Sequence, residues 1–273
     1  MVRKLFKYET AYYARTLSAV YIALLGVAVI GRIIAIFENE SVGYSILRGS
    51  TIFALVVAMI GVTGLSFIFS IVRYYKSMYT GEGYLTHTLP VKSGTIINVK
   101  LVMAVLVNIL SSVMCFVAFF IFTIGEWFNE FAKAGIYIVK NMFEDIPDEY
   151  MWRIIVYIIQ MLPMLLVTLF GSLLLYYMCI SIGQLFNKNR ILAAIGVYFA
   201  IYMISQAIGT IFSIVFTVFF AEKLDQYLST LTETQGLNLI HIVLAVALVI
   251  QIAMALLYYF IVRFINTKKL NLE

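Results

Sequence analysis

The sequence contains very little charge. Only 12% of its 273 residues are charged, whereas 63% are hydrophobic and 15% are aromatic. A typical soluble domain has about 25% charged residues, so this chain has too little polar surface to cover a water-soluble fold. Apolar stretches of twenty or more residues recur along the chain. They predict transmembrane helices, because each is long enough to cross a hydrocarbon core of about 30 Å.

The apolar stretches show no alternation of polarity. Residues 101–124 are apolar on every helical face, whereas a membrane β-strand alternates over about ten residues. The pattern therefore predicts an all-α polytopic membrane protein. The basic N-terminus leads into a full-length apolar stretch, so we expect a retained first span and not a cleaved signal. The six expected spans are residues 17–37, 51–72, 99–124, 154–185, 191–220 and 239–262.

The charged residues are distributed unequally between the two sides of the expected spans. With both termini in the cytoplasm, 13 of the 19 Lys and Arg residues fall on the inner side, and 11 of the 14 acids fall on the outer side. Inner loops of membrane proteins are enriched in basic residues. We therefore expect a multi-pass plasma-membrane protein with cytoplasmic termini. The net charge of +5 reflects this bias, so it predicts no nucleic-acid partner.

Residues for metal, redox or nucleotide chemistry are scarce. Cys115 and Cys179 both lie in expected spans, where they are expected to pack as small hydrophobic residues without a disulfide or zinc site. His87 and His241 fall on opposite sides of the membrane, so they cannot share a metal. No glycine-rich loop precedes a Lys and Ser/Thr pair in the manner of a Walker motif. We therefore expect no catalytic residue, no metal site and no bound cofactor.

The expected spans contain no Asp or Glu. A proton-driven transporter usually needs such a titratable group in the membrane, so energy for any transport would come from another protein. Arg32 is close enough to the end of the first span to extend to the interface. The other polar groups are neutral and could either join helices or line a substrate path. They are Asn108, Gln160, Gln184, Gln206 and Gln251.

Residues 1–16 are expected to form an interfacial helix on the inner leaflet. Val2, Phe6 and Tyr13 share one helical face, with Glu9 as the exception on it, and basic residues share another. Basic and aromatic residues before a first span favour contact with membrane lipid. The alternative is that these cations serve only to orient the first span.

The cytoplasmic segment 73–98 has features of a binding segment. Gly81 and Gly83 permit backbone turns, and Pro90 ends any preceding helix. Tyr84, Leu85 and Leu89 supply apolar side chains that a solvated loop would not need. The segment is therefore expected to bind either lipid or protein.

Two outer segments are also expected to be amphipathic, residues 125–153 and residues 221–238. The first should contain a helix over residues 128–142, and its acids reflect either topology bias or a cation site. In the fifth span, small residues recur every four positions and would allow another helix to approach closely. That helix could belong to this chain or to another subunit. The small residues are Ser205, Gly209 and Ser213.

The stretch Gly81–Val91 reads GEGYLTHTLPV, and Lys100 lies near the start of the third span. Together with the two ends of the chain, residues 5–9 and 268–272, it resembles the permease subunits of type-2 ABC exporters. The likeness is to the small six-span permeases of Gram-positive bacteria.

The resemblance implies that residues 73–91 form a coupling helix that docks on a separate ATP-binding subunit. That subunit would bind ATP and Mg. Two permeases, identical or different, would assemble with two ATPases, and the first and fifth spans would form the permease interface, where Ser205, Gly209 and Ser213 lie. The region 209–237 would form an outer re-entrant hairpin. The implied coupling residues are Tyr79, Glu82, Tyr84, Leu85, Thr86, Leu89 and Pro90.

The leading hypothesis is therefore a permease subunit of an ATP-driven exporter of an amphiphilic peptide, lipid or drug-like molecule. A membrane-anchored scaffold or sensor that recruits a cytoplasmic partner is the alternative from another class. The membrane subunit of an importer is a further alternative. An intramembrane enzyme is disfavoured, since no catalytic constellation is evident in the sequence.

Overall fold

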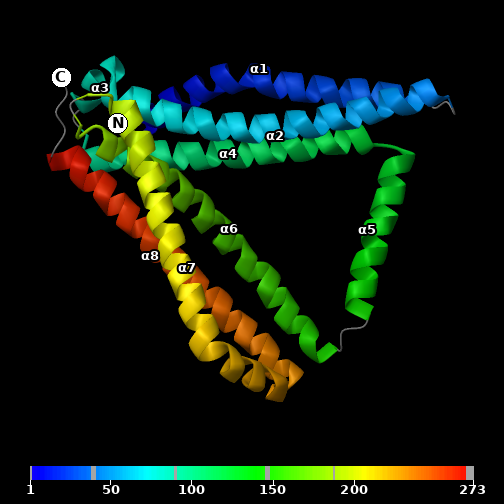
Figure 1. Cartoon of the computed structure of the whole chain (residues 1–273). Coiled ribbons are helices and arrows are strands. Elements are labelled where there is room, and N and C mark those ends of the chain that lie inside the picture. Colours follow the sequence, from blue (N-terminus) through cyan, green and yellow to red (C-terminus); the bar gives the residue numbers. More distant parts are fainter. Residues whose placement is uncertain (1, 38–40, 89–90, 145–147, 187, 269–273) are drawn as a thin grey trace. The chain divides into compact units, whose positions relative to one another are not determined.

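The computed structural model describes residues 2–37, 41–88, 91–144, 148–186 and 188–268 (Figure 1). Within these ranges the chain forms helices and no strand, which confirms the predicted all-α class. The helices are α1 (Val2–Ile36), α2 (Val42–Tyr79), α3 (Gly81–His87), α4 (Ser93–Thr123), α5 (Glu126–Glu144), α6 (Asp148–Gly183), α7 (Arg190–Thr230) and α8 (Glu233–Lys268).

Six of the helices in the described part of the chain are long and apolar enough to cross a membrane. The qualifying segments overlap the six predicted spans in order, so the prediction of a multi-pass membrane protein is confirmed. They are Val2–Ile36, Val42–Tyr79, Ser93–Thr123, Tyr150–Gly183, Arg190–Phe220 and Thr234–Lys268.

The helices extend further than the apolar stretches. The expected interfacial segment 1–16 is not a separate element, because α1 continues unbroken from Val2 with no Pro or Gly before Gly26 to end it. Likewise α2 extends to Tyr79 and so includes the first seven residues of the expected loop 73–98. The helix predicted over residues 128–142 is confirmed within α5. Helix α6 continues through Pro163.

The region 221–238 is mostly helical. It contains the end of α7 and the start of α8, and Figure 1 shows α7 bending toward its C-terminal end. Its proposed re-entrant position stays a prediction. Among the acids of the outer segment 125–153, residue 145 and the side chains of residues 126, 144, 148 and 149 lie outside what the structure describes. A cation site there therefore also stays a hypothesis.

The chain divides into two compact units. The first unit is Met1–Lys76 with Thr88–Asp145, and the second is Ser77–His87 with Ile146–Glu273. In the first unit, α1, α2 and α4 lie side by side (Figure 1). Two buried clusters join them. One contains Leu24, Ala28, Leu55, Val62, Cys115 and Ala118, and the other contains Tyr13, Leu17, Val99, Met103 and Val107.

In the second unit, α6 packs against both α7 and α8. Leu173 and Tyr177 of α6 and Val262 of α8 are fully buried. Helices α6 and α7 approach closely at Gly183, where an added Cβ would lie 2.7 Å from the backbone nitrogen of Ala194. Nearby, the Tyr176 and Tyr198 rings stack with centroids 5.1 Å apart. Gly183 therefore permits the packing of α7 on α6.

We expect Gly183→Ala to destabilise the protein, because the new methyl group must displace the backbone of α7. Overpacking of this kind costs about 1–3 kcal/mol, which should lower the apparent melting temperature in detergent by roughly 2–6 °C. Gly196→Ala is the matched control, since a Cβ there meets nothing within 4 Å and alanine is the better helix former. Equal melting temperatures for the two variants would contradict this account of α6 and α7.

Candidate functional site

The predicted coupling segment forms a short helix directly after α2. The backbone N–H of Gly83 donates to the carbonyl of Thr80 at 2.7 Å. A Cβ at Gly83 would lie 2.5 Å from the carbonyl oxygen of Met78, so only glycine permits this tight connection between α2 and α3. The two glycines singled out in the sequence therefore differ: Gly83 is sterically required, whereas a Cβ at Gly81 would meet nothing within 4 Å.

Two of the predicted partner-binding residues are presented on the surface of α3. Tyr84 is 66% exposed, and Glu82 is also exposed. Leu85 and Thr86 belong to α3, but their side chains lie outside what is described, as do Leu89 and Pro90 altogether. An exposed tyrosine can make apolar contacts and a hydrogen bond with a partner, and an exposed carboxylate can contact a basic group.

Tyr79 plays a different part, because its hydroxyl is engaged within the second unit. It lies 2.7 Å from the Ser181 Oγ of α6 and donates to the Asn266 Oδ1 of α8 at 2.9 Å. Ser181 and Asn266 are both buried, and Asn266 in turn donates to the carbonyl of Val262 at 2.8 Å. This tyrosine cluster (Tyr79, Ser181 and Asn266) fixes the end of α2 against α6 and α8.

A buried charged cluster in the first unit was not predicted. The Arg73 Nε lies 2.9 Å from the Glu9 Oε2, the Arg73 Nη2 lies 3.2 Å from the Glu9 Oε1, and the Lys100 Nζ lies 2.8 Å from the same Oε1. The guanidinium also stacks over the Tyr12 ring, 4.0 Å from its centroid. We call Glu9, Arg73 and Lys100 the ion triad. It joins the N-terminal part of α1, the end of α2 and the start of α4.

The ion triad is largely removed from solvent. The side chains of Glu9, Arg73 and Lys100 are 7%, 13% and 6% exposed. Burying a charge is unfavourable unless it is paired, so the carboxylate is what allows both cations to lie here. This explains why Glu9 interrupts the apolar face of the N-terminal segment. Two features of the sequence could have indicated the ion triad. They are a charge on an apolar helical face and basic residues near the ends of two spans.

Several intramembrane polar residues prove to join helices. The Asn108 Nδ2 of α4 donates to the Ser70 Oγ of α2 at 3.1 Å, and its Oδ1 accepts from the Ser66 Oγ at 3.1 Å. In the second unit, Gln160 of α6 lies 3.2 Å from the His241 Nδ1 of α8. The Thr168 hydroxyl donates to Gln251 at 3.3 Å. For Asn108, Gln160 and Gln251, the structure therefore supports the helix-packing alternative.

The small residues of the fifth span are exposed among the described residues of the second unit. Ser205, Gly209 and Ser213 are exposed on α7, and a Cβ at Gly209 would meet nothing within 4 Å. Packing against another helix of this chain, one of the two explanations of their spacing, is therefore not found in the described residues. Contact with another subunit stays a prediction.

The ion triad yields a prediction based on its charge balance. Glu9→Gln leaves two buried cations without their carboxylate, whereas Lys100→Gln preserves the Glu9–Arg73 pair. Removing one member of a buried pair costs about 3–5 kcal/mol, so Glu9→Gln should lower the apparent melting temperature by roughly 6–10 °C. Lys100→Gln should lower it by less than half as much. A larger loss in Lys100→Gln than in Glu9→Gln would contradict this account.

Comparison with known proteins identifies no relative from which a function could be transferred. No protein-family description, no curated protein and no solved structure matches the chain. Its function is therefore inferred from its own residues and their contacts.

Proposed function

We propose that this chain is the membrane-spanning permease subunit of an ATP-driven exporter, and that α3 is its docking element for a separate ATP-binding subunit. The observation that carries the proposal is the position of α3 between two membrane-length helices, with Tyr84 and Glu82 exposed on it. A docking element must offer side chains to a partner and also be firmly attached to the helices that it moves. The resemblance of Gly81–Val91 to type-2 ABC exporter permeases points to the same role.

The attachment of α3 supports this role. The tyrosine cluster ties the end of α2 to α6 and α8 just before α3 begins. The same continuous helix α2 carries Arg73, which joins α1 and α4 through the ion triad. Helix α2 therefore carries both attachments, the ion triad in the first unit and the tyrosine cluster in the second. Docking can bias the permease only if one state of the ATPase binds α3 more tightly than another.

The cargo that we propose is amphiphilic, such as a peptide, lipid or drug-like molecule. A groove of about 340 Å³ between α6 and α8 is lined by Val167, Phe170, Leu174, Ile252, Ala255, Leu256 and Tyr259. Its walls offer apolar contacts and one phenol, which suits a molecule with a large apolar part. In the proposed complex, a second permease copy or a related subunit lies against α7, and ATP and Mg are bound by the partner ATPase.

The proposed exporter lies in the plasma membrane with its termini and α3 in the cytoplasm and α5 outside. Two exposed lysines test this arrangement, Lys133 on α5 and Lys188 between α6 and α7. In a background with Cys115 and Cys179 changed to Ser, we expect an impermeant maleimide to label Lys133→Cys in intact cells. Lys188→Cys should be labelled only after lysis. The opposite pattern would place α5 in the cytoplasm and would refute the proposed orientation.

Docking through α3 is tested with two tyrosines of equal exposure. Tyr84 on α3 and Tyr137 on α5 are both 66% exposed. We expect the native protein, purified gently from its own membrane, to retain an ATP-binding subunit identified by mass spectrometry, with ATP turnover in the recovered complex. Tyr84→Asp should reduce recovery at least tenfold, because it places a carboxylate in an apolar contact. Tyr137→Asp should not change it.

The outcomes of this purification also separate the two classes of function. Recovery of an ATPase that depends on Tyr84, with ATP turnover in the recovered complex, supports the exporter. Recovery through Tyr84 of a partner without ATP turnover favours the scaffold or sensor. If the folded native protein retains no ATPase, or if Tyr137→Asp releases it equally well, the proposed role of α3 is wrong.

A further inference from the structure

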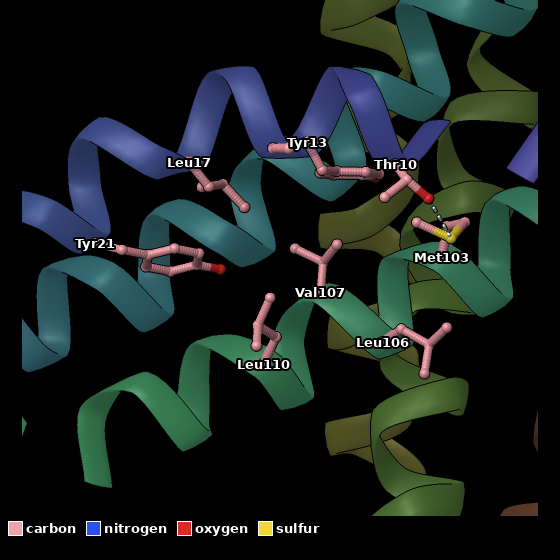
Figure 2. A pocket seen from close by; sticks show the side chains of 9 residues that line it. Thr10, Tyr13, Leu17, Tyr21, Met103, Leu106, Val107 and Leu110 are labelled. Carbon is pink, nitrogen blue, oxygen red and sulfur yellow. Dashed lines mark hydrogen bonds between the residues drawn. The ribbon is translucent and has the colours of Figure 1, made fainter. Parts of the chain in front are cut away.

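A second groove lies between α1 and α4 in the first unit. It has a volume of about 280 Å³, and Figure 2 shows the side chains of both helices that line it. Tyr13 and Leu17 are buried in its floor, whereas Leu106 and Leu110 are about half exposed. The lining residues are Thr10, Tyr13, Ala14, Leu17 and Tyr21 of α1 and Met103, Leu106, Val107 and Leu110 of α4.

Two hydroxyl groups along the groove are already hydrogen-bonded to the protein. The Thr10 Oγ1 donates to the carbonyl of Phe6 at 2.8 Å and lies 3.9 Å from the Met103 sulfur, the contact drawn in Figure 2. The Tyr21 hydroxyl lies 2.7 Å from the Ser111 Oγ. A polar ligand would therefore have to compete with these bonds, whereas an apolar one would not. The groove is suited to a hydrocarbon chain.

The groove is long for its volume. From Thr10 to Tyr21 it follows α1 for about 16 Å, given the rise of an α-helix. Its 280 Å³ is at the lower end of the range for drug-sized ligands, about 300–1,000 Å³. A single extended acyl chain fits these proportions better than a compact molecule does.

The α1 side of the groove continues into two exposed cations. Thr10, Ala14, Leu17 and Tyr21 recur at alternating spacings of four and three residues, which places them on one helical face. The same spacing continues backwards through Lys7 to Arg3, and both side chains are exposed. Glu9 is the single acid in α1, and it is buried in the ion triad, so no other carboxylate of α1 offsets these cations.

We propose that this groove binds one acyl chain of an anionic phospholipid, whose phosphate headgroup is held by Arg3 and Lys7. The lipid belongs to the leaflet on the N-terminal side. An apolar groove with cations at one end matches an acyl chain with an anionic headgroup. The lipid then acts as a structural component whose acyl chain fills the groove between α1 and α4. It is distinct from any transported cargo. This inference rests on the fold of the first unit and does not require the exporter function.

Native mass spectrometry of the purified full chain tests the proposal, with detergent micelles containing equal phosphatidylglycerol and phosphatidylcholine. We expect the native protein to retain one phosphatidylglycerol in preference to phosphatidylcholine. Ala14→Phe fills the groove and should abolish this retention. Ala19→Phe is the matched control, because Ala19 is also exposed on α1 but lies on the opposite helical face. Equal retention by the two variants, or none by the native protein, would overturn the proposal.

A second pair of variants tests the headgroup contact without altering the groove. The double variant Arg3→Gln, Lys7→Gln should lose most of the preference for phosphatidylglycerol, roughly fivefold for each cation near an anionic headgroup. The control is Lys4→Gln, Arg15→Gln, which removes the same charge at exposed positions outside this face. It should keep the preference. Equal loss in the two double variants would show general electrostatic attraction and would overturn the assigned headgroup site.

Discussion

In the hydrocarbon core of a bilayer there is no water to hydrogen-bond polar groups, and the organisation of this chain follows from that constraint. Backbone groups satisfy it locally by forming helices, which is why the described segments within the six apolar stretches are helical. Side chains satisfy it only by finding partners on other helices. The Asn108 contacts with Ser66 and Ser70 are such a solution within the apolar stretches. The ion triad and the tyrosine cluster pair buried polar groups in the same way near the ends of the helices. Because lipid tails are as apolar as the helices, no hydrophobic driving force holds the helices together in lipid. The polar contacts therefore add to the close packing of the buried clusters.

The element content was predictable from the sequence, because span length and uniform apolarity depend only on local composition. The amphipathic α5 was predictable for the same reason. The helix ends were not, since α1 and α2 continue into polar residues without a Pro or Gly to stop them. The ion triad was also missed as a cluster. Its members are separated by up to 91 residues, and sequence alone does not show that the exception at Glu9 and the cations of two other helices meet.

The candidate docking site was predictable in part. The motif Gly81–Val91 indicated a binding segment, and the exposed Tyr84 is consistent with that expectation. The inward orientation of the Tyr79 hydroxyl was not evident, because a tyrosine at the end of a span suits an interfacial position equally well. Its assignment to an internal cluster required the positions of Ser181 and Asn266, which are 102 and 187 residues away in the sequence.

The same polar contacts indicate which membrane-length helix of the second unit is held least firmly. In the first unit, α1 and α2 are bonded to α4 by charged or amide side chains, and in the second unit α6 and α8 share the tyrosine cluster. The described contacts of α7 are of another kind: the close approach at Gly183 and the stacked rings of Tyr176 and Tyr198, whose hydroxyls lie 3.5 Å apart. Beyond them, residues 202–220 of α7 are exposed. Segments with few buried contacts rearrange at the lowest free-energy cost, so in the proposed exporter α7 is the helix of the second unit that another subunit can most readily reposition.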